Sequence, residues 1–159
     1  MSDLRKAFWS QIYEIAKKDK DVVVLTGDLG YSFCENFQKD FPDQFINAGC
    51  AEQNMVGVAA GLARVGKKPH VYSNAIFLLM RAYEQVRDDI AYPNLNVKLI
   101  GANASGFLGF THNMQGSENC EELLKNLPNL IMAFSQNEVE LQNTMHSTYE
   151  NKNPTFIQL

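Results

Sequence analysis

The chain alternates continuous apolar runs with stretches whose apolar residues recur at helical spacing, and this alternation limits the folds open to it. Residues 22–25 (VVVL) are typical of a strand buried on both faces, whereas apolar residues in 3–18 fall on one helical face. We expect further strands at 44–47, 71–73, 97–101, 130–134 and 155–158, and further helices at 32–41, 51–65, 77–91, 118–126 and 137–149. This order predicts a three-layer α/β/α domain with a mainly parallel sheet.

Ligands of such sheets bind where the strands end, at the carboxyl edge. The loops expected at that edge begin at Gly27, Asn47, Ser73 and Ala102. The last of them, residues 102–117, is rich in Gly, Asn and Ser. We therefore look for a functional site among these four loops.

Charge, apolar stretches and cysteine spacing exclude several classes of partner and site. The net charge is −4 without a block of like charge, which argues against nucleic-acid and anionic-membrane partners. The longest mostly apolar stretch, residues 55–63, is far shorter than the roughly 20 residues that span a bilayer. Three cysteines without CxxC spacing indicate reduced thiols in a cytoplasmic protein, and we expect no metal site in this chain.

Residues 47–66 (NAGCAEQNMVGVAAGLARVG) resemble the Gly-x-(Ala/Ser)-Glu-(Gln/His) helix start of the transketolase-like pyrimidine-binding domain. The preceding 25–49 (LTGDLGYSFCENFQKDFPDQFINAG) resembles the first strand and turn of that family. The following 70–90 (HVYSNAIFLLMRAYEQVRDDI) resembles the strand and helix that enclose the cofactor ring. The ordered set covers nearly the whole chain. It implies thiamine diphosphate as cofactor, with Glu52 touching its aminopyrimidine ring.

Glu52 is also unusual on physical grounds. It falls in the first turn of an expected helix whose next positions on that face, Met55 and Val56, are apolar. A carboxylate there is costly unless it has a partner. In the family this glutamate shares a proton with a ring nitrogen, so the resemblance implies that Glu52 is both catalytic and cofactor-binding. The alternative is an ordinary acid at a helix N-terminus, stabilised by the macrodipole.

The other side of the same helix carries Gln53, Gly57, Gly61 and Arg64. Small residues four apart allow another backbone to come close. In the family this helix lies near a subunit interface. Packing on the domain's own sheet explains the spacing equally well.

The resemblance implies further site residues. Tyr72 and Phe77 match positions where aromatic side chains pack on the pyrimidine ring, and Phe77 is our first choice for stacking. Arg81 matches an arginine near the active site, although a solvated arginine is equally compatible, and the Phe77–Arg81 spacing is one residue longer than in some relatives. His112, in the GFTH segment 109–112, resembles the histidine of Gly-Pro-Thr-His, which hydrogen-bonds substrate or shuttles a proton. A solvated loop histidine is its alternative.

The substrate end departs from the family pattern. Many sugar-handling transketolases have an acidic residue at the position of Leu108 and the motif's proline at Phe110. Deoxyxylulose-phosphate synthases carry a phosphate-binding arginine near Gly101. We therefore expect the cofactor end to be intact, without ordinary pentose-phosphate specificity.

The Gly-Asp-Gly…Asn-Asn signature of the diphosphate-binding domain does not occur in the sequence. We expect residues 1–159 to be a single pyrimidine-binding domain, without a diphosphate-binding or transketolase C-terminal domain. The resemblance then implies a diphosphate-binding partner subunit that holds Mg²⁺ or a similar divalent metal, in a heterodimer or, preferentially, an α2β2 tetramer.

The expected activity is transfer of a two-carbon ketol unit between sugars or sugar-like substrates. An alternative is an acyl- or acetyl-transferring synthase subunit acting on a 2-oxo acid, of the deoxyxylulose-phosphate synthase or dehydrogenase E1-β kind. Leu108 mildly favours either this alternative or ketol transfer to an unusual acceptor. A third alternative is a non-catalytic scaffold, against which Glu52 argues.

Overall fold

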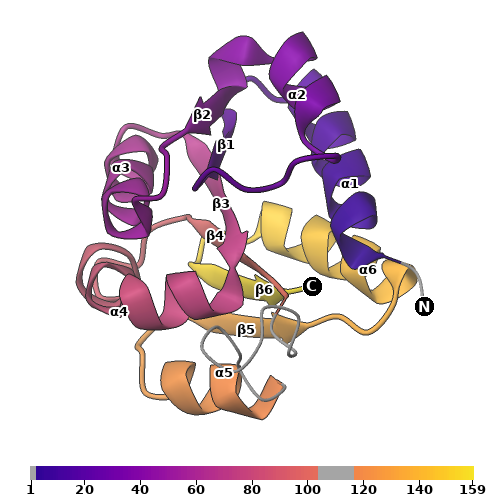
Figure 1. The fold of residues 1–159 in the computed structure, drawn as a ribbon. Coiled ribbons are helices and arrows are strands. Elements are labelled where there is room, and N and C mark those ends of the chain that lie inside the picture. The colour runs from indigo at the N-terminus through magenta and orange to yellow at the C-terminus, as the bar shows by residue number, and fades with distance from the viewer. Residues whose placement is uncertain (1–2, 104–116) are drawn as a thin grey trace.

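A single parallel sheet organises the computed structural model, which describes residues 3–103 and 117–159, the side chains of 117–119 excepted. Six strands lie in the order β2-β1-β3-β4-β6-β5, and every neighbouring pair is parallel. Helices cover both faces of the sheet (Figure 1). The predicted three-layer α/β/α architecture is confirmed.

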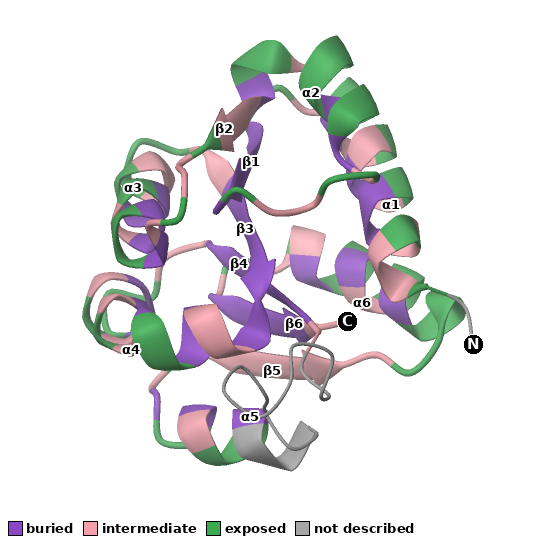
Figure 2. Cartoon of the chain, in the orientation of Figure 1, coloured by how far each residue is buried: buried purple, intermediate pink, exposed green. Residues whose placement is uncertain are grey.

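The strands agree closely with the apolar runs of the sequence. They are β1 (Val22–Thr26), β2 (Phe45–Asn47), β3 (Lys68–Asn74), β4 (Lys98–Ala102), β5 (Ile131–Phe134) and β6 (Thr155–Gln158). The central strands are buried on both faces, whereas the edge strand β5 is only half-buried along its length (Figure 2). Helical crossovers return the chain to the same edge after each strand, which is why all strands run in one direction.

The helices are α1 (Leu4–Lys18), α2 (Glu35–Asp40), α3 (Glu52–Arg64), α4 (Tyr83–Gln85), α5 (Ser117–Leu124) and α6 (Glu138–Glu150). A short 3₁₀ turn, η1 (Pro42–Gln44), precedes β2. No helix among the described residues is long and apolar enough to cross a membrane.

The segment 77–91 is not the single α-helix that its periodicity predicts. Two π-helical stretches, η2 (Phe77–Arg81) and η3 (Val86–Ala91), flank α4. The Ala82 N–H donates to the Phe77 carbonyl, five residues back, at 3.2 Å. A π-helical turn accommodates one residue more than an α-helical turn, and such turns often occur at functional sites. The wider turn explains how the long Phe77–Arg81 spacing fits into this helix.

Alternation along the strands divides the core in two. Val23 and Leu25 of β1 pack with α3, the segment 77–91 and α5, whereas Val22 and Val24 pack with α1, α2 and α6. Figure 1 shows α3 and α4 on one side of the sheet and α1 and α6 on the other. The side that a strand residue faces therefore decides which helices it meets.

Candidate functional site

Helix α3 begins at Glu52, next to the carboxyl ends of β1 and β3. The Glu52 side chain is 2% exposed, although it occupies the first turn of a helix. An acid that only stabilises a helix dipole needs no burial. The burial of Glu52 therefore indicates a carboxylate held for a partner.

Both oxygens of this carboxylate have contacts within the chain. The Arg81 Nη1 donates to Oε2 at 2.6 Å, and the Ser73 hydroxyl donates to Oε1 at 3.4 Å. Ser73 is fully buried at the end of β3, whereas the Arg81 side chain is 45% exposed. The carboxylate thus has one fixed neutral partner and one solvent-accessible cationic partner.

Phe77 lies beside this ion pair. The Arg81 guanidinium carbon is 4.2 Å from the centre of the Phe77 ring, a cation–π distance. The π-helical turn η2 carries both residues, and Arg81 reaches from it to Glu52 on the neighbouring helix α3. The structure therefore brings three predicted site residues, Glu52, Phe77 and Arg81, together.

Tyr72 lies apart from them, on the opposite face of the sheet. Its ring stacks on Phe8 at 5.7 Å between centroids and lies 5.2 Å from Trp9, both in α1. Burial raises the pKa of Tyr72 to about 12. This surrounding is that of a core aromatic residue.

The remaining candidates are those that the family resemblance assigns to the substrate end. His112, Leu108 and Phe110 lie outside the described residues, so the role of His112 stays a prediction. Within 3–103 and 117–159, no group of three or more His, Cys, Asp or Glu residues is placed to hold a metal ion.

Two glycines precede the carboxylate: Gly27 begins one of the strand-end loops, and Gly49 is the glycine of the Gly-x-(Ala/Ser)-Glu motif. A Cβ on Gly27 would lie 3.2 Å from Glu52 Oε1 and 3.4 Å from the Gly49 carbonyl oxygen. Gly49 has a φ of +71°, which disfavours any other residue. The loops after β1 and β2 therefore approach Glu52 as bare backbone. Their place at the strand ends was the sequence signal for them.

Asn47 ties these two loops together. Its side-chain Oδ1 accepts from the backbone N–H groups of Asp28 and Gly49, each at 3.0 Å. Its Nδ2 donates to Asp28 Oδ1 at 3.2 Å. Hydrogen bonds from Tyr31 and then Asn47 hold the pKa of Asp28 below its usual value, so this exposed carboxyl group is ionised at neutral pH. Asp28 adds an acceptor near Glu52 that sequence reasoning did not identify.

Gly101 explains one departure from the family pattern. A Cβ at this position would lie 2.6 Å from ring atoms of Phe156, far inside contact distance. No side chain fits there unless Phe156 moves. The phosphate-binding arginine of some relatives therefore has no counterpart at Gly101.

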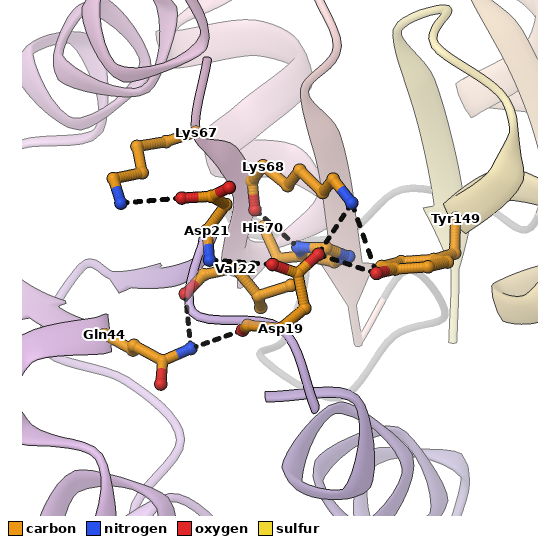
Figure 3. Close-up of polar contacts among 8 residues, drawn as sticks. All are labelled: Asp19, Asp21, Val22, Gln44, Lys67, Lys68, His70 and Tyr149. Carbon is orange, nitrogen blue, oxygen red and sulfur yellow. Dashed lines mark hydrogen bonds and ion pairs between the residues drawn. The ribbon is translucent and has the colours of Figure 1, made fainter. Parts of the chain in front are cut away.

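A second polar cluster occupies the opposite, amino edge of the sheet (Figure 3). Asp19 Oδ2 accepts from the Lys68 ammonium and the Tyr149 hydroxyl, both at 2.6 Å. Burial alone would raise the pKa of Asp19, but these two hydrogen bonds outweigh it and lower the pKa to about 2. Nearby, burial lowers the pKa of His70 to about 4, so this histidine is neutral in the folded chain. The cluster joins α1, β3 and α6 and lies away from Glu52.

The small-residue face of α3 does not pack on its own sheet. A Cβ on Gly57 or Gly61 would meet no heavy atom within 4 Å. Val58 on the same helix, Val65 at its C-terminal end and Met80 on the adjacent η2 are exposed. Of the two explanations for the glycine spacing, packing within the domain is therefore wrong.

Comparison with known proteins extends the resemblance. The family model for the transketolase pyrimidine-binding domain matches residues 1–159. A putative transketolase C-terminal section from Methanocaldococcus jannaschii is 36% identical over 98% of this chain and 50% of its own length. One of the subunits of apulose-4-phosphate transketolase from Phocaeicola vulgatus is 45% identical over 68% of this chain and 36% of its own length.

A solved structure shows the same fold. It is described as a split-gene transketolase, an inactive β4 tetramer, and it superposes with a TM-score of 0.85 at 35% identity, covering 98% of this chain and 50% of that one. The chain thus spans about half the length, or less, of these relatives.

Proposed function

Because the chain belongs to the transketolase pyrimidine-binding domain family, we propose that it is the pyrimidine-binding subunit of a thiamine-diphosphate-dependent enzyme that transfers a two-carbon ketol unit between sugars or sugar-like substrates. The observation that carries the proposal is the buried Glu52 carboxylate beside the Phe77 ring at the carboxyl edge of the sheet. Two relatives that match as separate sections or subunits are named as transketolases, which supports ketol transfer over the synthase alternative.

The residues around Glu52 fit an aminopyrimidine ring. Its carboxylate can accept a hydrogen bond from a ring nitrogen, and Phe77, beside the same ion pair, offers a flat apolar face. When bound, thiamine diphosphate supplies the reactive thiazolium carbon. The work of this chain is to orient the ring and to hold a proton between Glu52 and the ring nitrogen.

Other side chains take supporting roles in the proposal. Ser73 fixes one carboxylate oxygen of Glu52, so that the other points toward the ring. We assign ring contact to Phe77 rather than Tyr72, because Tyr72 packs against α1 on the other face. Asp28, next to Gly27, is available to accept a hydrogen bond from a hydroxyl group, and His112 keeps its predicted role in proton transfer.

We further propose a diphosphate-binding partner subunit, in an α2β2 assembly, that holds the divalent metal, Mg²⁺ or a similar ion. The open glycine face of α3 runs along the same helix that begins at Glu52, so a subunit seated there would reach the site. The solved relative, an inactive tetramer of β chains, supports the need for a second kind of chain. The exposed thiol of Cys50 is compatible with the reducing cytoplasm.

The test is a calorimetric titration of thiamine diphosphate with Mg²⁺ into this chain, into a candidate diphosphate-binding subunit, and into their mixture. Size-exclusion chromatography of the same samples reports assembly. We expect tight binding and a larger complex only in the mixture. Tight Mg²⁺-dependent binding by this chain alone would refute the shared site.

A further inference from the structure

Arg81 makes the same two contacts that the proposed function assigns to the cofactor ring. Its Nη1 lies 2.6 Å from Glu52 Oε2, and its guanidinium carbon lies 4.2 Å from the Phe77 ring centre. A guanidinium is planar, cationic and rich in N–H donors. An aminopyrimidine that carries a proton on its ring nitrogen is also planar and donates N–H to a carboxylate.

We propose that Arg81 is a placeholder: in the cofactor-free chain its guanidinium occupies the carboxylate and the aromatic face that the aminopyrimidine ring takes over, and the ring displaces it. This inference rests on the proposed function of Glu52. It adds a competition within the site, because Glu52 Oε2 cannot keep Arg81 at 2.6 Å and also receive the ring nitrogen from the same direction.

The exposure of the two partners of Glu52 identifies Arg81 as the one that exchanges. Ser73 is fully buried in β3, so its hydroxyl cannot turn into solvent. Arg81 is 45% exposed and ends the π-helical turn η2, so its long side chain can turn into solvent. Water can solvate the guanidinium once it leaves Glu52, so Arg81 is the partner that can be exchanged.

The chain without cofactor needs a counter-charge for the buried Glu52 carboxylate. Glu52 is 2% exposed, and a buried carboxylate without a partner is strongly destabilising. Arg81 provides the counter-charge until the cofactor arrives. Because the cofactor must first break the Arg81–Glu52 contact, it binds less tightly than it would to a site without that contact.

The first half of the test uses the chain alone and no cofactor. Urea unfolding of Glu52→Gln, Arg81→Gln and the double variant gives the coupling between the two side chains. We expect a coupling of at least about fivefold in the unfolding equilibrium constant, or about 1 kcal/mol. The matched pair is Arg87 and Asp88, on the same helical segment and both nearly half exposed, for which we expect no resolvable coupling. A Glu52–Arg81 coupling no larger than that of the control pair would overturn the placeholder.

The second half titrates thiamine diphosphate with Mg²⁺ into the assembled complex. We expect Arg81→Gln to bind about fivefold more tightly than the wild type and Arg87→Gln to bind like the wild type. Unchanged or weaker binding by Arg81→Gln, with a wild type that binds, overturns the placeholder and leaves the cofactor role of Glu52 standing. If no form binds, the proposed function fails and this inference with it.

Discussion

The two edges of the sheet each hold a carboxylate paired with a cation, but the pairs differ in how they are enclosed. At the amino edge, Asp19 accepts hydrogen bonds from Lys68 and Tyr149 (Figure 3). The side chains of Asp19 and Lys68 are 15% and 34% exposed. At the carboxyl edge, the more deeply buried Glu52 is paired with an arginine that is 45% exposed. The amino-edge cluster is closed by the chain itself, whereas the carboxyl-edge pair is open on one side.

This difference separates a structural role from a functional one. Asp19, Lys68 and Tyr149 come from three distant segments, so their contacts hold α1, β3 and α6 together. Glu52 and Arg81 come from neighbouring helices that already pack together in the core, so their contact joins no further element to the fold. We therefore expect variants at the amino edge to alter stability and variants at the carboxyl edge to alter chemistry.

The largest expected effect is that of Glu52→Gln on turnover. Loss of the carboxylate removes the proton acceptor at the ring nitrogen, so kcat of the assembled enzyme should fall about 10³-fold. Its unfolding free energy should change much less. The control is Glu138→Gln, because Glu138 also begins a helix but is exposed. Near-normal turnover of Glu52→Gln would show that the carboxyl-edge carboxylate has no catalytic role.

Lowering the pH should reduce the unfolding free energy, because the buried His70 at the amino edge resists protonation. The folded-state pKa of about 4 lies below the ordinary 6.5, so the unfolded chain takes up the proton first. Stability from this group is complete above pH 6.5 and is lost as the pH falls toward 4, by about 3 kcal/mol. In urea unfolding at pH 7, 5.5 and 4.5, the unfolding free energy of His70→Gln should depend less on pH than that of the wild type. His146→Gln, at an exposed position, should not. A wild-type chain equally stable at pH 7 and pH 4.5 would contradict the assignment.

Asp19→Asn should lower the unfolding free energy at pH 7 by about 2 kcal/mol, because the folded carboxylate has its pKa depressed to about 2. That contribution is present above the unfolded pKa of 3.8 and disappears as the pH falls toward 2. Asp21→Asn is the matched control, since its pair with Lys67 is exposed. Turnover per folded molecule should stay unchanged in both. A loss of turnover in Asp19→Asn would show that the two edges are not independent.

The smallest effect tests the open side of α3. Gly57→Ala should raise the unfolding free energy of the lone chain by up to about 1 kcal/mol, because alanine favours the helix and its Cβ meets open space. The same methyl group should weaken assembly with the partner, measured by sedimentation. Asn143→Ala, on an exposed position of α6, should leave assembly unaffected. Unaltered assembly of Gly57→Ala would place the interface elsewhere.

Most of the fold could be predicted from the sequence, because each strand is a local apolar run and each helix has a local period. The π-helical turn η2 could not, since the hydrogen bond from Ala82 to Phe77 leaves no trace in the apolar periodicity of the segment. The face of the sheet on which Tyr72 lies could not be predicted either. Alternation places Tyr72 and Ser73 on opposite faces, but only the packing of α1 shows which face belongs to which helix.

The candidate site was predictable as far as motifs reach. Glu52, Phe77 and Arg81 stand in recognisable order, yet the sequence does not show that Arg81 pairs with Glu52, 29 positions away. Ser73 and Asn47 were visible only as residues at strand ends. The amino-edge cluster has no motif, because its members come from three separate segments and meet only in the folded chain.

The most direct test is a crystal structure of the assembled complex with thiamine diphosphate. The proposed role of Glu52 predicts that one of its carboxylate oxygens lies within about 2.8 Å of a nitrogen of the aminopyrimidine ring, a distance typical of a charge-assisted hydrogen bond, and that Arg81 has left that oxygen. A Glu52 side chain turned away from the ring, or a ring bound at another place, would contradict it.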